Sequence, residues 1–307
     1  MRKVVAIVGP TAVGKTALSI RLAHDLAGEV ISGDSMQVYR HLNIGTAKVT
    51  PSERAGVPHY LIDICDINQR FSAADFQTQA QQAIGKITSR GHLPLVVGGT
   101  GFYVSSLVDN LQLGGDHFSE QSKQIRQKWQ DAADKLGNDR IWEKLNEQDP
   151  EAAAKIPMNN VRRVIRALEV IETTGKLFSQ QPDRRPIADF LLIGLTTDRQ
   201  ALYDRINRRV DQMVRAGLVD EARWLYDHGG ANYQSGKGIG YRELFPYFRG
   251  EVALPAAIEQ IKLDSRHYAK RQLTWFRNKL TVHWFDLVSG QDTIEDIEDF
   301  TRDWLTK

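Results

Sequence analysis

The chain has 307 residues, of which 41% are hydrophobic and 25% charged, as in a globular protein large enough for one or two domains. Its net charge of +2 gives by itself no reason to expect a nucleic-acid partner, so the distribution of charge matters more than the sum. The single cysteine, Cys65, excludes an intramolecular disulfide, no apolar run approaches the roughly 18 residues of a membrane span, and the N-terminus does not fit a signal peptide. We therefore expect a cytoplasmic protein with no membrane partner and with Cys65 as a buried apolar side chain.

The first third of the chain alternates short apolar runs with longer helical patterns. A helix is predicted from about Lys15 to Ala27, closed by Gly28. Buried strands are predicted at "VVAIV" (4–8), "EVIS" (29–32), "HYLID" (59–63) and "LPLVVGG" (93–99). Strand and helix in this rhythm indicate an α/β fold, a P-loop NTPase-like parallel sheet covered by helices.

A second region begins near Gly114, where strand-like runs give way to charged helical patterns that continue to about Pro186. Turn-rich stretches at Gly114-Gly115 and "QPDRRP" bracket it, as at domain boundaries. We therefore divide the chain into a first part of the catalytic core (1–113), a small all-helical insertion (114–189) and a second part of the core (190–307).

The second part of the core opens with another buried strand, "FLLIGL" (190–195). Thr197 and Gln200 predict a capping box for a helix that runs to Gly217. Further along, the chain predicts a helix ending at "HGG", a glycine-rich loop "SGKGIGYRE", a long basic helix over about 258–279 and a short strand "VHWF".

The segment "GPTAVGKT" (9–16) fits the pattern G-x-x-x-x-G-K-[ST] and lies between a predicted strand and a predicted helix, as the P-loop of ATP- and other nucleotide-binding proteins requires. Glycines let backbone N–H groups surround a diphosphate, Lys15 neutralises its oxygens, and the Thr16 hydroxyl can ligate Mg²⁺. The expected diphosphate-binding residues are Gly9, Pro10, Thr11, Ala12, Val13, Gly14, Lys15 and Thr16.

A P-loop ATPase or kinase also needs an acid at the end of an apolar strand to hold Mg²⁺. The best candidate strand here ends in "LVVGGTG", with glycine at that place, which argues against simple phosphoryl transfer. The acid that does follow a strand is Asp34. Because the carboxyl ends of parallel strands form the ligand crevice, Asp34, Ser35 and Thr100 are expected to meet the P-loop there. Asp34 is then a candidate base, although "GDS" also suits an Asx turn or helix cap.

Basic residues gather on the long C-terminal helix. Its apolar positions Ala269, Leu273, Phe276 and Leu280 are expected to face the core, whereas Lys262, Arg266 and Lys270 recur on another face. Acids are absent from 266–279, and aromatic residues lie among the basic ones, a pattern that favours RNA over a solvated, salt-bridged face. Arg162, Arg163 and Arg166 form a similar edge in the insertion. Arg205 and Arg209, one helical turn apart, are candidates to aim at the P-loop.

Six segments in this order, "GPTAVGKT", "ISGDSMQVYR", "NIGTAK", "GGTGFY", "GKGIGYRE" and "KRQLTWFRN", cover nearly the whole chain and resemble the bacterial tRNA dimethylallyltransferases, or tRNA isopentenyltransferases. The resemblance implies transfer of a dimethylallyl group from dimethylallyl diphosphate to the exocyclic N6 amine of the adenosine on the 3′ side of the anticodon. The tRNAs are those that read codons beginning with U, and diphosphate is released.

Residue roles follow from the same resemblance. Asp34 matches the family's general base, Thr11 to Thr16 match its diphosphate site, and Arg209 matches its second diphosphate-binding cation, so Asp34, Thr11 and Arg209 are the expected catalytic residues. The tRNA-contacting positions it implies are Asp34, Ser35, Met36, Gln37, Thr100, Arg162, Arg163, Arg166, Lys237, Gly238, Ile239, Gly240, Tyr241, Arg242, Lys270, Arg271, Gln272, Trp275 and Arg277. One further contact falls on Lys123 or Arg126, of which we favour Arg126.

The partners implied are the tRNA anticodon stem-loop and dimethylallyl diphosphate. Mg²⁺ is the only metal we expect, since no His-x-x-His or similar pair indicates zinc, and we expect a monomer. Three alternatives stay open: an adenylate isopentenyltransferase, against which the insertion and the basic helix argue; a small-molecule kinase, which would need the missing strand-end acid; and a non-catalytic RNA-binding protein with a structural P-loop.

Overall fold

The computed structural model describes residues 1–111, 113, 120–180 and 186–307. The chain folds into two compact units, one formed by Met1–Asn110 with Pro186–Lys307 and the other by Leu111–Arg185. Ile187 and Ala188 pack into the core of the larger unit, and Asp189 pairs with Lys3 in the sheet. The second part of the core therefore begins a few residues earlier than the expected 190. The turn-rich boundary expected at 114–115 lies outside the described residues, as does the boundary expected at 181–186 except for Pro186.

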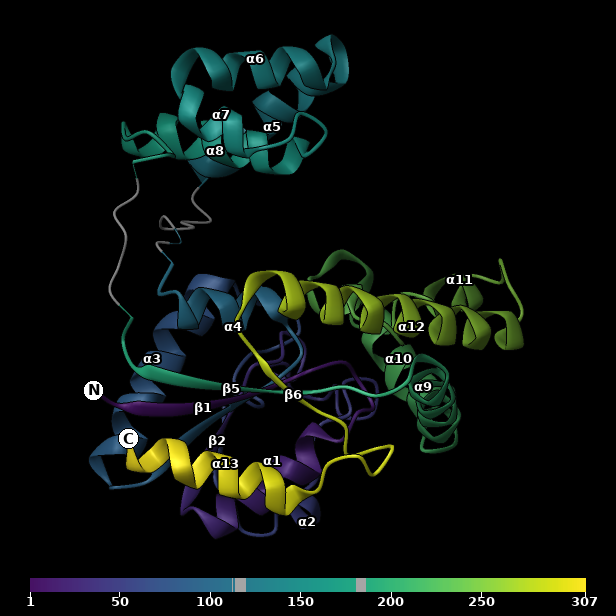
Figure 1. Cartoon of the computed structure of the whole chain (residues 1–307). Helices are drawn as coiled ribbons and strands as arrows, with labels where there is room; N and C mark the ends of the chain where they lie inside the picture. The colour runs from purple at the N-terminus through teal and green to yellow at the C-terminus, as the bar shows by residue number, and fades with distance from the viewer. Residues whose placement is uncertain (112, 114–119, 181–185) are drawn as a thin grey trace. The chain divides into compact units, whose positions relative to one another are not determined.

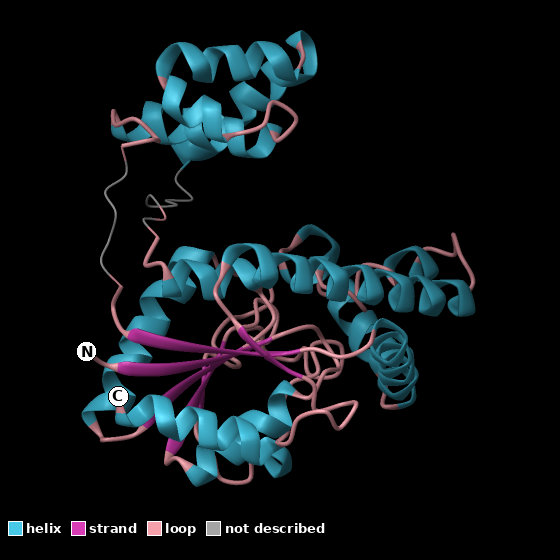
Figure 2. Ribbon diagram, viewed as in Figure 1, coloured by secondary structure: helices cyan, strands magenta, loops and turns pink. Residues whose placement is uncertain are grey.

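The larger unit is built on a parallel sheet with strand order β3-β2-β4-β1-β5-β6 (Figure 2). Its strands are β1 (Lys3–Val8), β2 (Gly28–Ser32), β3 (His59–Tyr60), β4 (Leu93–Val97), β5 (Asp189–Leu195) and β6 (His283–Phe285). The predicted α/β class is confirmed. Strand β3 is shorter than predicted, because Leu61 and Asp63 adopt φ of 61° and 57°, outside the extended region.

Alternate residues of β1 enter two different cores, as the period of a strand requires. Val4, Ala6 and Val8 face a core shared with α3 (Ala73–Ser89), α4 (Gly101–Val108) and α12 (Leu254–Lys279). Val5 and Ile7 face a core shared with α1 (Lys15–Asp25) and α13 (Ile294–Thr306). The sheet is therefore a buried middle layer between two layers of helices (Figure 1). Both chain ends lie at one end of it, where Lys3 Nζ donates to the carbonyl oxygens of Trp304 (2.6 Å) and Leu305 (2.9 Å).

The helices of the larger unit are α1 (Lys15–Asp25), α2 (Pro51–Arg54), α3 (Ala73–Ser89), α4 (Gly101–Val108), α9 (Arg199–Arg215), α10 (Leu218–Asp227), α11 (Phe245–Phe248), α12 (Leu254–Lys279) and α13 (Ile294–Thr306), with short 3-10 turns at Gly230–Asn232 and Ser235–Lys237. The sequence reading of these helices needs corrections. Gly28 does not cap α1 but opens β2, where a Cβ would lie 2.9 Å from Leu95 Cδ1. Asp198, not Thr197, caps α9 by accepting from two backbone N–H groups. Helix α12 begins four residues before the predicted start.

The smaller unit contains only helices among its described residues: α5 (Glu120–Leu136), α6 (Asn138–Gln148), α7 (Pro150–Lys155) and α8 (Val161–Thr174) (Figure 2). Its own core includes Trp129, Ile141, Leu145 and Leu168. An all-helical body inserted between β4 and β5 is the organisation predicted from the loss of strand-like runs. In neither unit is a described helix long and apolar enough to cross a membrane.

Candidate active site

The larger unit contains a cavity of about 1140 Å³ at the carboxyl ends of its strands. Its walls come from the P-loop after β1, the segment around Asp34 after β2, and Gly98-Gly99 after β4, with α9 and α12 contributing further side chains. Ligands of open parallel sheets bind in this position, because the loops that leave neighbouring strands meet there.

The backbone conformation of the P-loop segment is suited to binding an anion. Gly9 and Gly14 adopt φ of 137° and 109°, which residues other than glycine rarely adopt. In addition, a Cβ on Gly9 would lie 2.5 Å from the Leu195 carbonyl oxygen. Helix α1 starts at Lys15 with no side-chain cap on its first turn. Its N-terminal N–H groups are therefore available to an anion, favoured by the helix dipole.

Lys15 lies folded over this loop, where its Nζ donates to the carbonyl oxygens of Gly9 (2.9 Å) and Pro10 (2.6 Å). Burial lowers the pKa of Lys15 to about 7, and repulsion from Arg209 adds to this effect while Asp34 opposes it. The amine is therefore poorly stabilised as a cation until an anion reaches it.

Two arginines of α9 face the same loop. The Arg205 Nε donates to the Ala12 carbonyl oxygen at 2.8 Å, which confirms the expected aim of this residue. Burial lowers the pKa of Arg209, with a smaller lowering effect from Arg205, whereas Asp34 and Glu53 raise it. Arg205, Arg209 and Lys15 thus concentrate positive charge in the cavity, and a diphosphate would relieve their mutual repulsion.

Asp34 lines the cavity, and one of its oxygens, Oδ1, accepts from the backbone N–H groups of Met36 (2.8 Å) and Gln37 (3.3 Å). The turn geometry considered for this residue is therefore present together with a position in the cleft. Thr100 joins the loops after β2 and β4, because its Oγ1 accepts from the Ser35 N–H at 3.0 Å. Asp34, Ser35 and Thr100 come together as predicted.

The glycine in place of a strand-end acid has a steric cause. Gly98 follows β4 so closely against the neighbouring loop that a Cβ would lie 2.3 Å from the Gly33 carbonyl carbon and oxygen. No side chain fits there, so an acid could not occupy this position without moving the loop that carries Asp34.

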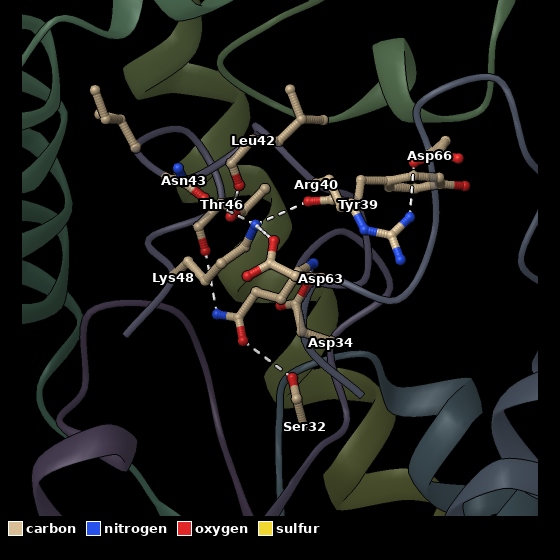
Figure 3. Close-up of polar contacts among 12 residues, drawn as sticks. Ser32, Asp34, Tyr39, Arg40, Leu42, Asn43, Thr46, Lys48, Asp63 and Asp66 are labelled. Carbon is tan, nitrogen blue, oxygen red and sulfur yellow. Dashed lines mark hydrogen bonds and ion pairs between the residues drawn. The ribbon is translucent and has the colours of Figure 1, made fainter. Parts of the chain in front are cut away.

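One wall of the cavity is the loop of residues 37–48, which buried polar groups hold in place (Figure 3). The Gln37 amide donates to the Thr46 (3.2 Å) and Ala47 (3.4 Å) carbonyl oxygens, and its Oε1 accepts from the Ser32 hydroxyl (3.0 Å). Lys48 Nζ donates to the Tyr39 carbonyl oxygen at 2.8 Å and pairs with an Asp63 carboxylate oxygen at 2.6 Å (Figure 3). The Gln37 side chain, expected to contact tRNA, is therefore engaged inside the protein.

The same loop is anchored from the other side by Glu221 of α10. Its carboxylate accepts from the backbone N–H groups of Asn43 (2.7 Å), Ile44 (2.9 Å) and Gly45 (2.9 Å) and from the Tyr241 hydroxyl (2.6 Å). Tyr241 is fully buried, and this position corrects its expected role, because its side chain supports the loop and is not available to RNA.

The expected tRNA residues divide by exposure. Those on the surface are Arg162, Arg163, Lys237, Arg242, Lys270, Arg271 and Arg277. Gln272 and the two glycines Gly238 and Gly240 are buried, and Ser35, Met36, Ile239 and Trp275 are partly buried. The resemblance therefore did not separate the exposed members of these segments from the buried ones, and their contact with tRNA stays a prediction.

Two of the basic positions on the long helix are already paired. Lys262 binds Asp211 of α9 at 2.8 Å, and the Arg266 guanidinium donates to the Asn207 side-chain oxygen at 2.7 Å. The four-residue spacing of Lys262, Arg266 and Lys270 was interpreted as one RNA-binding face. This interpretation is wrong for the first two, because α9 covers them.

In the helical unit, Arg126 and Arg166 surround Glu169, whose side chain is completely buried. The ion-pair distances are 3.6 Å for Arg126 and 2.8 Å for Arg166. These arginines thus neutralise a buried charge, whereas Lys123 forms an exposed pair with Glu120 at 3.0 Å.

Sequence reasoning missed two residues that line the cavity, Glu53 and Tyr268. Glu53 belongs to a capping box with Thr50 at the start of α2, and that motif could be read from the sequence, but nothing in it places the helix beside the cavity. Tyr268 precedes the basic segment of α12 by two residues, and the i, i+4 spacing from Tyr268 to Gln272 was the signal that both share one face.

Comparison with known proteins gives a consistent result. The profile of the family described as IPP transferase matches residues 37–279. A tRNA dimethylallyltransferase from Limosilactobacillus fermentum is 66% identical over 100% of both chains. The crystal structure of the tRNA isopentenylpyrophosphate transferase from Bacillus halodurans superposes with a TM-score of 0.75 at 50% identity, covering 99% of this chain and 96% of that one. A eukaryotic dimethylallyltransferase acting on tRNA gives a TM-score of 0.83 at 30% identity, covering 100% and 80%.

Proposed function

Since the chain belongs to the IPP transferase family, we propose that it transfers a dimethylallyl group from dimethylallyl diphosphate to tRNA. The acceptor is the exocyclic N6 amine of the adenosine that follows the anticodon in tRNAs reading codons that begin with U. The observation that carries this proposal is that the P-loop and Asp34 line one cavity while Gly98 leaves no room for a strand-end acid.

The reaction is a displacement at carbon. The bond between C1 of the dimethylallyl group and the diphosphate oxygen breaks as the bond from N6 to C1 forms, and diphosphate leaves. Negative charge develops on the leaving oxygen, so donors that are already in place stabilise the transition state more than the ground state. The N–H groups of the P-loop, Lys15 and Arg209 are the donors that line the cavity for this purpose.

Asp34 acts on the nucleophile. The lone pair of an adenine amine is delocalised into the ring, so a carboxylate that accepts its hydrogen bond orients the amine and takes the proton as the new bond forms. One Asp34 oxygen is fixed by backbone N–H groups, which leaves the other to meet the substrate. A base inside a duplex or stack cannot reach such a cavity, so the adenosine must be turned out of its stack.

Mg²⁺ fits the site as an ion shared with the diphosphate. The Thr16 hydroxyl is exposed beside the P-loop, and Asp34 lines the same cavity. Among the described residues, no group of three or more His, Cys, Asp or Glu side chains is placed to hold a metal ion without substrate. When bound, Mg²⁺ neutralises part of the charge on the leaving diphosphate.

The tRNA anticodon stem-loop is expected to contact the exposed basic residues of α12 and of the glycine-rich loop, and Arg162 and Arg163 of the helical unit add further positive charge on that unit. Such side chains bind phosphates with little dependence on sequence. We place the enzyme in the cytoplasm as a monomer, and sedimentation of the purified protein with and without a stem-loop checks the stoichiometry.

The direct test is an assay of purified protein with labelled dimethylallyl diphosphate, Mg²⁺ and an unmodified anticodon stem-loop that has three adenosines after the second anticodon position. We expect label on the adenosine 3′ to the anticodon, and a roughly 10²–10⁴-fold lower rate for Asp34→Asn, the range of general base catalysis. A free AMP arm separates the adenylate isopentenyltransferase alternative. Efficient labelling of AMP with none of the RNA would overturn the proposal.

A further inference from the structure

A buried glutamine on α12 bridges two loops of the active site. The Gln272 Oε1 accepts from the Thr11 backbone N–H at 3.0 Å, and its Nε2 donates to the Gly99 carbonyl oxygen at 2.9 Å. The residue is only 4% exposed. Its amide therefore uses both ends inside the protein and ties the P-loop after β1 to the turn after β4.

Helix α12 approaches the loop beside this amide very closely. A Cβ on Gly99 would lie 2.1 Å from Gln272 Nε2, and a Cβ on Gly101 would lie 2.4 Å from the Trp275 ring. Helix α12 therefore packs directly against the backbone of residues 99–101. This close packing is possible because residues 99 and 101 are glycines. The position of the Gln272 side chain is set by this close approach of helix and loop.

Tyr268, one turn earlier on α12, continues the contact toward the base. Its hydroxyl interacts with the side chains of Gln272 and Thr100, and Thr100 in turn accepts from the Ser35 N–H at 3.0 Å, next to Asp34. Tyr268 lines the cavity, and its ring lies under the Arg271 guanidinium, 5.7 Å from the ring centroid. The Gln272 bridge and the Thr100–Ser35 hydrogen bond therefore connect the P-loop to the Asp34 segment through the backbone of residues 99–100.

We propose that Gln272, with Tyr268, is a positioning residue that fixes the separation between the diphosphate cradle and Asp34. It acts through Thr11 on one side and through Thr100 and Ser35 on the other, and it does not contact tRNA. The inference rests on the proposed function, since it concerns the geometry of that reaction.

The physical reason for such a spacer is the alignment that displacement requires. The leaving oxygen, C1 and N6 must lie nearly in line, with the diphosphate held by one loop and the amine oriented by another. A misplacement of about 1 Å between such groups can lower the rate about 10²-fold. Loops are mobile parts of a fold, so a hydrogen-bonded link from a long helix keeps the two loops in register.

The test compares Gln272→Met, which keeps the side-chain length but removes both hydrogen bonds, with Tyr268→Phe, which removes only one hydroxyl. Single-turnover rates at saturating substrates are measured together with the affinities for inorganic diphosphate and for the stem-loop. For Gln272→Met we expect a rate about 10–100-fold lower, weaker diphosphate binding, and stem-loop affinity within twofold of wild type. Tyr268→Phe is expected to lower the rate with both affinities retained.

Lys270→Ala, two residues before Gln272 and exposed, is the comparison variant. We expect it to weaken stem-loop binding, whereas Gln272→Met is expected to retain it. If Gln272→Met also weakens stem-loop binding while its rate stays at the wild-type value, Gln272 is a tRNA contact and the inference is wrong. An unchanged rate in both Gln272→Met and Tyr268→Phe would overturn it as well.

The double variant and the wild-type control complete the design. Because the two side chains act in one series of contacts, the double variant is expected to be no slower than Gln272→Met alone, whereas independent roles would multiply their effects. Failure of the proposed function appears separately, as a wild-type protein that does not prenylate the stem-loop. The diphosphate affinity of Gln272→Met still tests the spacer in that case.

Discussion

At the scale of single residues, the proposed anion site is defined by basic side chains whose charged forms burial disfavours. Lys15 donates only to backbone carbonyl oxygens, and burial and Arg209 together lower its pKa to about 7. A diphosphate supplies the missing negative charge, so its arrival must raise the pKa of Lys15 again. Binding and protonation are therefore linked at this residue.

The linkage predicts proton uptake on diphosphate binding. Above pH 7 the free enzyme holds Lys15 largely neutral, and the complex holds it charged, so the affinity falls as the pH rises through about 7. Calorimetry at pH 8 in buffers of different ionisation enthalpy is expected to show uptake of a fraction of a proton that approaches one. Lys15→Met should bind more weakly and remove this uptake. Equal heats in all buffers for the wild-type protein would contradict the account.

At the scale of elements, α12 has different functions on its different faces. Ala269 and Phe276 are buried in the two cores, Gln272 reaches the active-site loops, and Lys262 pairs with α9. The exposed positions near Lys270 are the ones that we propose for RNA contact. Composition could not separate these faces. The basic character of the helix was correct as a prediction, but only packing against α9 decides which cations are free to bind phosphate.

Because some basic residues of α12 are paired and others are exposed, we expect their substitutions to change the salt dependence of stem-loop affinity differently. The double variant Lys270→Ala, Arg271→Ala is expected to bind the stem-loop more weakly, with the slope of log affinity against log salt smaller by about 1.4 to 1.8, since each of the two lost phosphate contacts releases roughly 0.7–0.9 fewer counterions. Lys262→Ala is the matched control and should leave the slope unchanged, because its amine is held by Asp211. The prediction is wrong if Lys262→Ala alters the slope as much as the double variant.

At the scale of the whole molecule, a buried carboxylate links the strands and loops at one end of the sheet. Opposite the active site, Glu29 at the start of β2 accepts from the Tyr60 hydroxyl (2.6 Å) and from the Arg90 guanidinium (2.7 Å), and it contacts His92. Burial, the largest influence, acts to raise the pKa of Glu29, but the hydrogen bonds from Tyr60, Arg90 and His92 together lower it below its usual range. This carboxylate therefore stabilises the fold in its charged form.

The stabilisation by Glu29 depends on pH with a definite sign. Since its pKa is lower in the folded than in the unfolded chain, the contribution is complete above the unfolded value of about 4.3 and is lost as the pH falls through the folded value. Glu29→Gln is expected to cost about 2 kcal/mol of unfolding free energy at pH 7, with the difference from wild type shrinking by pH 3. Urea unfolding at pH 7, 5 and 3 measures it. Glu120→Gln, in an exposed pair with Lys123, serves as the control.

A difference between wild type and Glu29→Gln that stays constant from pH 7 to pH 3 would contradict this role. The control is expected to change the free energy of unfolding by well under 1 kcal/mol at every pH, as is usual for exposed pairs.

Much of this architecture could be predicted from local pattern. Short runs rich in apolar residues located β1, β2, β4 and β5, and the P-loop motif located the segment proposed to bind the anion, because these signals lie in consecutive residues. The hydrogen bonds by which Glu221 and Lys48 anchor the 37–48 loop could not be predicted, nor could those of Gln272 with the Thr11 N–H and the Gly99 carbonyl oxygen. Their partners are far apart in the sequence, with 261 residues separating Thr11 from Gln272, and a single buried polar residue leaves no periodic signal.

The central claim is that this chain places a dimethylallyl group on tRNA, and mass spectrometry of nucleosides from bulk tRNA tests it most directly. Deletion of the gene is predicted to remove N6-(dimethylallyl)adenosine and any nucleoside made from it, wild-type protein to restore the mark, and Asp34→Asn protein to leave it absent or strongly reduced. Persistence of the prenylated adenosine at its normal level in the deletion strain would contradict the claim.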